Sequence, residues 1–283
     1  MGGPATFDAT RLQISQHLGV EPSFDVAIEI ERRVGFLYQQ MVATGRHALV
    51  LGVSGGVDSA TTGRLCHLAV RRLRAAGRDA TFVAVRLPYG SQIDEADAQL
   101  ALEFVGADRV MTVDVRPATD GAIEALRAGG LTFTDDRQRD FVYGNIKARQ
   151  RMVVQYAIAG ALPGLVVGTD HAAEAVTGFF TKHGDGAADL TPLTGLTKRR
   201  VRALAKALGA PAALIAKAPT ADLEDLTPGR PDEEALGVTY DDIDDFLEGR
   251  PVHAAAARRI LHHYRATEHK RRLPITPTDE ENR

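Results

Sequence analysis

The chain has 283 residues, of which 44% are hydrophobic and 25% charged, and its formal net charge at pH 7 is −3. This composition is ordinary for a globular protein, and the small negative charge argues against broad nucleic-acid binding. No apolar run approaches the ~20 residues of a membrane helix, and the start lacks a signal-peptide core, so we expect a cytoplasmic protein. The single cysteine, Cys66, excludes an internal disulfide, and its place on a helical stripe with Thr62 and Ala69 indicates a core residue.

The first predicted elements lead to a buried strand. Residues 1–23 are polar and include Pro4 and Pro22, and we expect an irregular N-terminal extension there. Hydrophobic residues recur at helical spacing over 24–44 and stop at a glycine. The segment 48–53 is apolar or glycine, which is typical of a parallel strand buried on both faces.

The stretch S-G-G-V-D-S at 54–59 follows this strand and has the parts of an anion site. A glycine turn before a helix directs backbone N–H groups at a ligand, and the helix end adds the equivalent of roughly +0.5 charge. The stretch does not match the Walker phosphate-loop pattern, because residues 48–59 contain no lysine. The hydrolase pattern G-x-S-x-G matches 52–56 but leaves Asp58 and Ser59 unexplained. S-G-G-x-D-S explains both and resembles the pyrophosphate loop of enzymes that cleave ATP between its α and β phosphates; a capped glycine turn without a ligand is the remaining interpretation.

Strands and helices alternate along the following chain. We expect helices at 59–77, 94–105, 118–128 and 141–161, a polar loop at 129–140, and strands at 80–85, 109–115 and 164–169. This alternation predicts an α/β fold, with a doubly wound parallel sheet flanked by helices. Ligands bind such sheets beyond the carboxyl ends of the strands. Polar residues occur at these positions: 54–59 after the first strand, Arg86 and Gln92 after the second, and Thr169, Asp170, His171 and Glu174 after the fourth.

Further motifs occur in a fixed order along the chain. They are G-N-I-K-A-R at 144–149, G-T-D-H-A-A-E at 168–174, G-F-F-T-K-H-G-D-G-A-A-D-L-T-P-L at 178–193, L-T-K-R at 196–199, K-A-P-T-A-D-L at 217–223 and T-E-H-K-R at 267–271. With the S-G-G-x-D-S loop, they make the chain similar to the ammonia-dependent NAD synthetases, an N-type ATP pyrophosphatase family. The resemblance extends from residue 24 to Arg271, and it departs from the family at Val57, where glutamine is usual.

The resemblance implies an adenine nucleotide α-hydrolase-like, Rossmann-like fold. It implies one catalytic domain at 24–273, between an N-terminal extension at 1–23 and a tail at 274–283. The implied reaction converts deamido-NAD (nicotinic acid adenine dinucleotide) to NAD through an acyl-adenylate, with release of pyrophosphate and then AMP. The nitrogen source would be free ammonia, or ammonia passed on by a separate protein. Because this chemistry depends on positioning and charge stabilisation, no covalent nucleophile is expected.

The resemblance also implies roles for individual residues. Asp58 and Lys198 are expected to be catalytic, and Asp58 and Glu174 to bind Mg²⁺, which prefers carboxylate oxygens; helix capping is the alternative role of both acids. The expected ATP contacts are Gly52, Val53, Ser54, Gly55, Gly56, Val57, Asp58, Ser59, Arg86, Gln92, Thr169, Lys198 and Thr220. The expected deamido-NAD contacts are Arg149, Lys182, Asp189, His269 and Lys270.

The resemblance further implies a homodimer, with the apolar helix around Met152, Val153 and Tyr156 as its provisional contact. The net charge and the lack of a membrane-length apolar run predict no nucleic-acid or membrane partner. The loops 129–140 and 220–232 are polar and rich in glycine or proline, and we expect them to order over bound nucleotides. Three other functions remain: a different ATP pyrophosphatase, similar to GMP synthetase or a tRNA-modifying enzyme; a serine hydrolase that uses Ser54; and a nucleotide sensor without catalysis.

Overall fold

The computed structural model of the chain describes residues 4–90, 95–220, 225–272 and 274–277. At its centre lies a four-stranded parallel sheet in the order β3-β2-β1-β4. The strands are β1 (Ala48–Gly52), β2 (Thr81–Arg86), β3 (Arg109–Thr112) and β4 (Gly164–Val167). Since β1 pairs with β2 on one side and with β4 on the other, the chain reverses its winding direction beside β1. Ligands bind at such a switch point in open α/β sheets.

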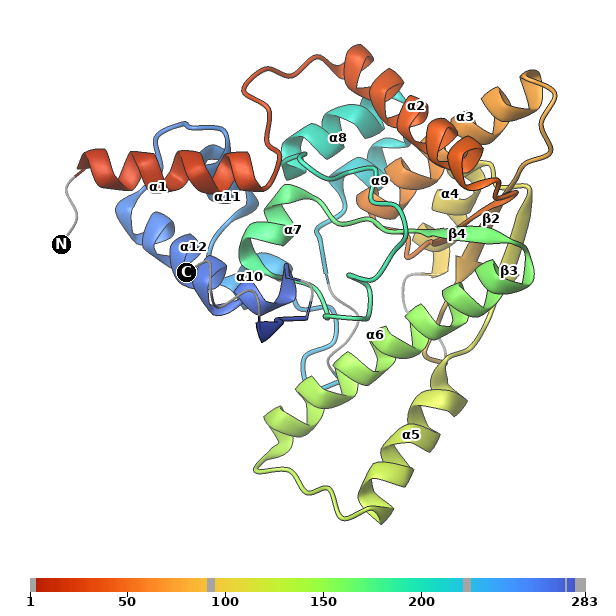
Figure 1. Cartoon of the computed structure of the whole chain (residues 1–283). Helices are drawn as coiled ribbons and strands as arrows, with labels where there is room; N and C mark the ends of the chain where they lie inside the picture. Colours follow the sequence, from red (N-terminus) through yellow and green to blue (C-terminus); the bar gives the residue numbers. More distant parts are fainter. Residues whose placement is uncertain (1–3, 91–94, 221–224, 273, 278–283) are drawn as a thin grey trace.

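Helices cover both faces of the sheet, which confirms the doubly wound α/β prediction (Figure 1). Side chains alternate between the two faces of a strand. Leu49 and Leu51 therefore lie in one core, whose helices are α2 (Val26–Thr44), α3 (Val57–Ala75), α4 (Glu95–Val105), α8 (Lys198–Ala207) and α9 (Ala212–Ala216). Val50 lies in the opposite core, where Ala159 of α6 (Asp136–Ala161) packs against it. Cys66 is fully buried in the first core, as predicted.

A second group of helices forms its own hydrophobic cluster beside the sheet. It contains α1 (Pro4–His17), α7 (Ala172–Thr177), α10 (Asp232–Leu236), α11 (Tyr240–Leu247) and α12 (Ala254–Ala266), and a short 3₁₀ helix, η1 (Glu268–Lys270), follows. Ile14 and Leu18 are buried in this cluster, and α1 lies along α11 in Figure 1. The expectation of an irregular segment at 1–23 is therefore wrong for α1, because Ile14 is buried in a cluster with residues of a helix more than 200 residues away.

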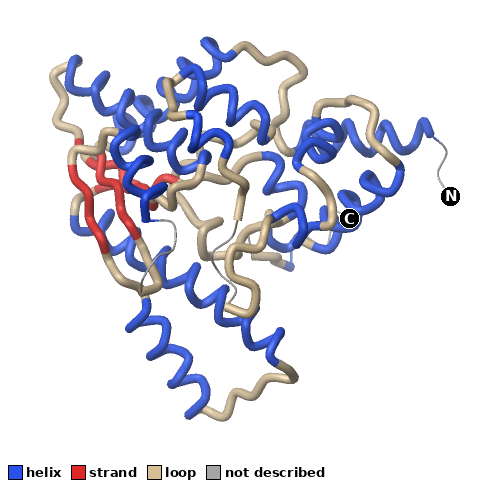
Figure 2. The backbone as a smooth tube through the Cα atoms, turned by 180° about the vertical axis from the view of Figure 1, so that it is seen from behind, coloured by secondary structure: helices blue, strands red, loops and turns tan. Residues whose placement is uncertain are grey.

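The helices α5 (Arg116–Ala128) and α6 form an arm that projects from the body (Figures 1 and 2). α6 begins at Asp136 rather than at the predicted 141, because the Asp135 side chain accepts the Gln138 N–H at 2.7 Å and caps the helix. The end of the predicted loop 129–140 is thus helical. Within the described residues, no helix has the length and apolar character needed to span a membrane.

Candidate active site

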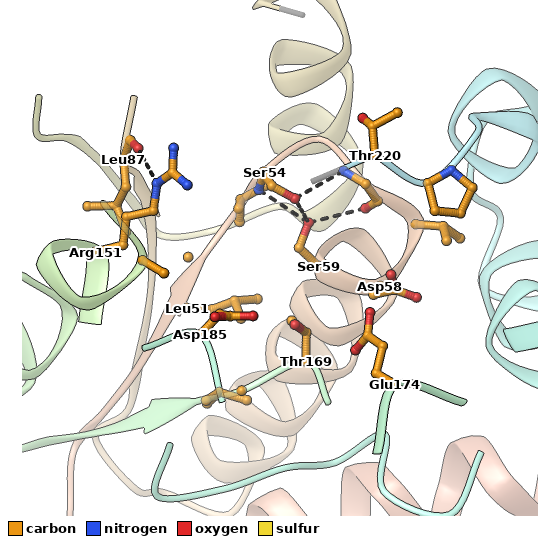
Figure 3. Close-up of a pocket in the computed structure, with 18 of the residues that line it drawn as sticks. Leu51, Ser54, Asp58, Ser59, Leu87, Arg151, Thr169, Glu174, Asp185 and Thr220 are labelled. Atoms are coloured by element: carbon orange, nitrogen blue, oxygen red, sulfur yellow. Dashed lines mark hydrogen bonds between the residues drawn. The ribbon is translucent and has the colours of Figure 1, made fainter. Parts of the chain in front are cut away.

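The glycine turn after β1 is held in shape by its own hydroxyl groups (Figure 3). The Ser59 hydroxyl accepts the Ser54 N–H at 3.3 Å and donates to the Gly56 carbonyl at 3.1 Å. The Ser54 hydroxyl accepts the Gly56 N–H and lies 3.3 Å from the Ser59 hydroxyl. α3 starts at Val57 directly after this turn, so the N–H groups of the first helical turn face the same side as the loop.

Two neighbouring helices fix the position of this turn. Gly55 has a φ of +88°, and a Cβ there would lie 3.0 Å from the backbone nitrogen of Ala98 at the start of α4. Only glycine combines that conformation with so close an approach. From the other side, the Gln155 side chain of α6 accepts the Gly52 N–H at 2.8 Å.

A cavity of about 300 Å³ opens at this turn, at the carboxyl ends of β1 and β4. It thus lies where the sheet topology places a ligand. Its lining includes these residues of the predicted ATP and metal sites: Gly52, Val53, Ser54, Gly56, Val57, Asp58, Ser59, Thr169, Glu174, Lys198 and Thr220.

Four charged or titratable side chains converge at one end of the cavity. The Lys198 ammonium group lies 2.7 Å from Asp58 Oδ2 and 3.5 Å from His171 Nε2. The same His171 nitrogen lies 3.5 Å from Asp58 Oδ1 and 3.5 Å from Glu174 Oε1. In Figure 3 the carboxylates of Asp58 and Glu174 point toward each other. The Lys198 side chain is only 1% exposed, so its charge depends on these partners.

The pKa values of these groups follow from burial and from each other's charge. Burial alone would raise the pKa of Asp58, but the charge of the Lys198 ammonium and its hydrogen bond to the carboxylate outweigh burial, and the pKa is lowered. Burial, with the nearby Asp58 charge, raises the pKa of Glu174 well above its usual range. Burial also lowers the pKa of His171 to about 3, so the imidazole is neutral. Its Nδ1 accepts the Glu174 N–H at 3.4 Å, which assigns its proton to Nε2.

These residues fit a divalent cation. Ligand atoms of Asp58, His171 and Glu174 all lie within 4.8 Å of one another. Asp58 Oδ1 is buried and accepts no hydrogen bond from the described residues, so one carboxylate oxygen is free to bind an ion. Because Nε2 of His171 carries the proton, the two carboxylates are the better ligands, and hard carboxylate oxygens suit Mg²⁺.

The predicted deamido-NAD cations form a separate group beside this cavity. The Arg149 guanidinium donates to the Lys182 carbonyl at 3.3 Å, and the Lys182 ammonium donates to the His269 carbonyl at 2.5 Å. Lys270 donates to the Gly178 and Phe180 carbonyls at 2.8 and 2.7 Å. Four of the five expected residues therefore lie together, on α6, the loop after α7, and η1.

Other predicted site residues lie elsewhere. Arg86 makes a bidentate ion pair with Glu95 at 2.5–2.6 Å and does not line the cavity. Asp189 accepts the Val166 N–H at 2.8 Å and so anchors β4. Gly55 faces α4 rather than the cavity. Gln92 falls outside the described residues.

The cavity also contains residues that the sequence patterns did not single out. Arg151 and Gln155 line it from α6, Asp185 from the loop before Asp189, and Asp232 from the start of α10. Arg151 donates to the Leu87 carbonyl at 3.0 Å (Figure 3). The four-residue spacing of Arg151 and Gln155 puts both on one helical face, and this spacing is the only sequence feature that points to their shared position at the cavity. Asp185 belongs to the motif at 178–193, but nothing in that pattern marks it as a cavity residue.

The hydrolase interpretation finds no support in this geometry. The Ser54 hydroxyl is hydrogen-bonded within its own turn, and across the described residues no histidine forms a hydrogen bond with it. A serine nucleophile needs such a base within reach.

Comparison with known proteins is consistent with this site. The profile of the NAD synthase family matches residues 29–274. The chain belongs to the NAD synthase family. It is 63% identical over 277 residues to the NH(3)-dependent NAD(+) synthetase of Streptomyces coelicolor, covering 98% of this chain and all of that protein. It is 61% identical over 271 residues to the enzyme of the same name from Burkholderia mallei, covering 96% of this chain and 95% of the relative.

Solved structures agree with this family membership. The NAD+ synthetase of Burkholderia pseudomallei superposes with a TM-score of 0.83 at 59% identity, covering 95% of this chain and 98% of that one. The NMN synthetase of Francisella tularensis superposes with a TM-score of 0.79 at 34% identity, covering 90% and 99%. The NAD synthase fold is therefore common to proteins named for a dinucleotide and for a mononucleotide product.

Proposed function

We propose that this member of the NAD synthase family is a ligase that joins ammonia to the carboxylate of deamido-NAD and consumes ATP. The observation that carries this proposal is the cavity beyond β1 and β4, where the loop 54–59, the Lys198 ammonium and two carboxylates meet. The relatives named NH(3)-dependent NAD(+) synthetase, at 61% and 63% identity, support the reaction and the nitrogen source.

The reaction has two steps, and neither requires a covalent bond to the protein. A carboxylate oxygen of deamido-NAD attacks the α-phosphorus of ATP, the bond from that phosphorus to the bridging oxygen breaks, and pyrophosphate leaves. Ammonia then attacks the acyl carbon of the adenylate, the bond from that carbon to the AMP oxygen breaks, and a proton leaves the nitrogen. Backbone N–H groups of the loop 54–59 bind the pyrophosphate, and Lys198 stabilises the charge that accumulates on it.

We assign Mg²⁺ to Asp58 and Glu174. The free Oδ1 of Asp58 and the carboxylate of Glu174 across from it support this assignment. When bound, the ion supplies positive charge to phosphate oxygens. His171 lies beside both acids, with its Nε2 atom 3.5 Å from Asp58 Oδ1 and 3.5 Å from Glu174 Oε1.

The cluster of Arg149, Lys182, His269 and Lys270 is the proposed site for deamido-NAD, which carries a pyrophosphate of its own. Asp185 lies between the two sites, because it lines the ATP cavity and accepts the Thr181 N–H at 2.9 Å beside the cation cluster. The acyl group to be amidated can therefore meet the α-phosphate near Asp185.

We also propose that the chain forms a homodimer through the α5–α6 arm. Phe141 and Val153 of α6 are exposed, whereas Tyr156 of the same helix packs into the sheet core. The predicted contact surface is thus restricted to the outward face of α6. Sedimentation of the wild type should give a dimer, and Val153→Glu should shift it toward the monomer. A monomeric wild type would contradict this assignment.

The decisive assay measures the products of the reaction and also traces the carboxylate oxygen of deamido-NAD. The purified chain is given ATP, Mg²⁺, ammonium and deamido-NAD labelled with ¹⁸O in its carboxylate. We expect NAD, AMP and pyrophosphate in equal amounts, with one ¹⁸O atom in AMP, because the carboxylate oxygen stays on the α-phosphorus. Label in inorganic phosphate, or AMP without label, would contradict adenylation. Asp58→Ala should abolish amide formation, while Asp79→Ala, at an exposed loop position, should leave it unchanged.

Nicotinic acid mononucleotide belongs in the same assay, because the NMN synthetase of Francisella tularensis has the same fold. We expect this chain to prefer deamido-NAD, since its more similar relatives are named NAD(+) synthetases. Faster amidation of the mononucleotide would reverse the assignment of the substrate and leave the chemistry intact.

A further inference from the structure

The start of α8 carries charges that a helix start disfavours. Its first three residues are Lys198, Arg199 and Arg200, and its first turn contains no acidic residue. The N-terminus of a helix carries a partial positive charge, so cations there are destabilising. Lys198 nevertheless occupies the first helical position, from which its ammonium reaches Asp58 in the cavity. Another part of the chain must compensate these charges.

α11 supplies the compensation. Asp244 is buried, and its Oδ1 accepts the Lys198 N–H at 2.9 Å while its Oδ2 accepts the Arg199 N–H at 2.7 Å. One carboxylate from a distant helix thus caps two of the N–H groups that a helix start leaves without partners. Glu248, just after α11, accepts from the Thr197 hydroxyl at 2.6 Å and so holds the residue before Lys198.

α11 also contacts the other end of the Lys198 side chain. Tyr240, one helical turn before Asp244, is buried, and the Lys198 Nζ atom lies 4.8 Å from the centre of its ring. The Tyr240 hydroxyl donates to Asp232 Oδ2 at 3.1 Å, and Asp232 lines the cavity. Neither Tyr240 nor Asp244 is among the residues that line the cavity.

We propose that Asp244 and Tyr240 are positioning residues for Lys198, Asp244 through the backbone N–H and Tyr240 through the face of its ring beside the ammonium. The inference rests on the proposed function in taking Lys198 as the cation that meets the ATP phosphates. The second hydrophobic cluster thereby contributes to catalysis, because α11 belongs to this cluster and positions Lys198 in the proposed ATP site.

The test is a double-mutant cycle with Lys198→Met as the second change. We expect Asp244→Ala to lower kcat by about 10- to 100-fold, with a much smaller change in KM for ATP, because misplacement of a charge-stabilising group acts mainly in the transition state. In the Lys198→Met background, Asp244→Ala should cause no further loss. Asp244→Asn keeps the side-chain volume and one acceptor oxygen and should recover part of the rate. Asp241→Asn, at a position of α11 that is 84% exposed, is the matched control.

Tyr240 is tested with two variants. Tyr240→Phe keeps the ring and should stay near the wild-type rate, whereas Tyr240→Leu should lose about 2- to 30-fold in kcat, the range of a cation–π contact. Thermal unfolding is measured for every variant. If Asp244→Ala does not fold, Asp244→Asn replaces it in the double-mutant cycle.

The same cycle is run on ATP binding by calorimetry, which does not depend on product formation. The inference would be overturned if the effects of Asp244→Ala and Lys198→Met multiplied in the double variant, both in kcat and in ATP affinity. It would also be overturned if a folded Asp244→Ala variant had the kcat of the wild type. A wild type that binds ATP and forms no NAD would overturn the proposed function instead, and the binding cycle would still decide the role of Asp244.

Discussion

The ion pair of Asp58 and Lys198 makes the strongest quantitative prediction. The Lys198 side chain is 1% exposed and lies 2.7 Å from an Asp58 carboxylate that is 19% exposed. Removing one partner of a buried pair leaves an uncompensated charge and costs about 3–5 kcal/mol. Because the Asn side chain keeps one oxygen that can accept a hydrogen bond from the Lys198 ammonium, we place Asp58→Asn at the lower end, at about 3 kcal/mol in the free energy of unfolding.

Replacing Lys198 should lower the free energy of unfolding less than replacing Asp58. Lys198→Met leaves a carboxylate that water in the cavity can reach, whereas Asp58→Asn leaves an ammonium that water cannot reach. The double variant Asp58→Asn with Lys198→Met has neither charge, so it should be more stable than the sum of the two losses predicts. We expect a coupling free energy of about 2 kcal/mol, within the range measured for contacting residues.

Urea unfolding of the wild type, the two single variants and the double variant measures the loss of stability in each variant and the coupling free energy. It is carried out with EDTA and without nucleotide. Asp79→Asn is the control, because Asp79 is exposed in the loop before β2. An Asp58→Asn variant as stable as this control would show that the Lys198 ammonium does not need a charged partner. Losses of stability that add without coupling would likewise show that Lys198 does not depend on Asp58 for its burial.

Further predictions concern the loop, the cysteine and Asp244. Gly55→Ala should destabilise the protein more than Gly209→Ala in urea unfolding, because both glycines have a φ near +88° but only Gly55 faces the backbone of α4; equal losses would show that the close approach does not matter. Cys66 should not react with a thiol reagent until the chain is unfolded, because it is fully buried and burial raises the pKa of its thiol; rapid labelling of the native protein would contradict this packing. Burial raises the pKa of Asp244 from 3.8 to about 6. Since the folded protein holds this proton more tightly than the unfolded chain, wild type should lose about 1.4 kcal/mol of stability relative to Asp244→Asn between pH 5 and pH 8; a constant difference would contradict it.

The parts of the site that are contiguous in the sequence were predictable from it. An apolar strand, a glycine turn and a helix start are local features, so the loop 54–59 and its place at the end of β1 follow from residue order. The alternation of strands and helices likewise predicts the parallel sheet, because a parallel crossover needs a helix between strands. Motif order then identified Glu174, Lys198 and Thr220 as cavity residues.

Only the tertiary structure decided which side chains meet across distant segments. Asp244 and Tyr240 lie in an acidic stretch, 222–248, whose sequence suggests a flap followed by a short helix. The packing of α11 against α8 brings both side chains to Lys198. α1 looks irregular in the sequence because the partners of its buried Ile14 lie far along the chain, in a cluster that includes α11. Arg86 ends β2, and only the tertiary structure shows that Glu95 of α4 pairs with it. Local pattern determines elements and turns, since both depend on near neighbours; partners across the chain depend on how the helices pack, and no short pattern encodes that packing.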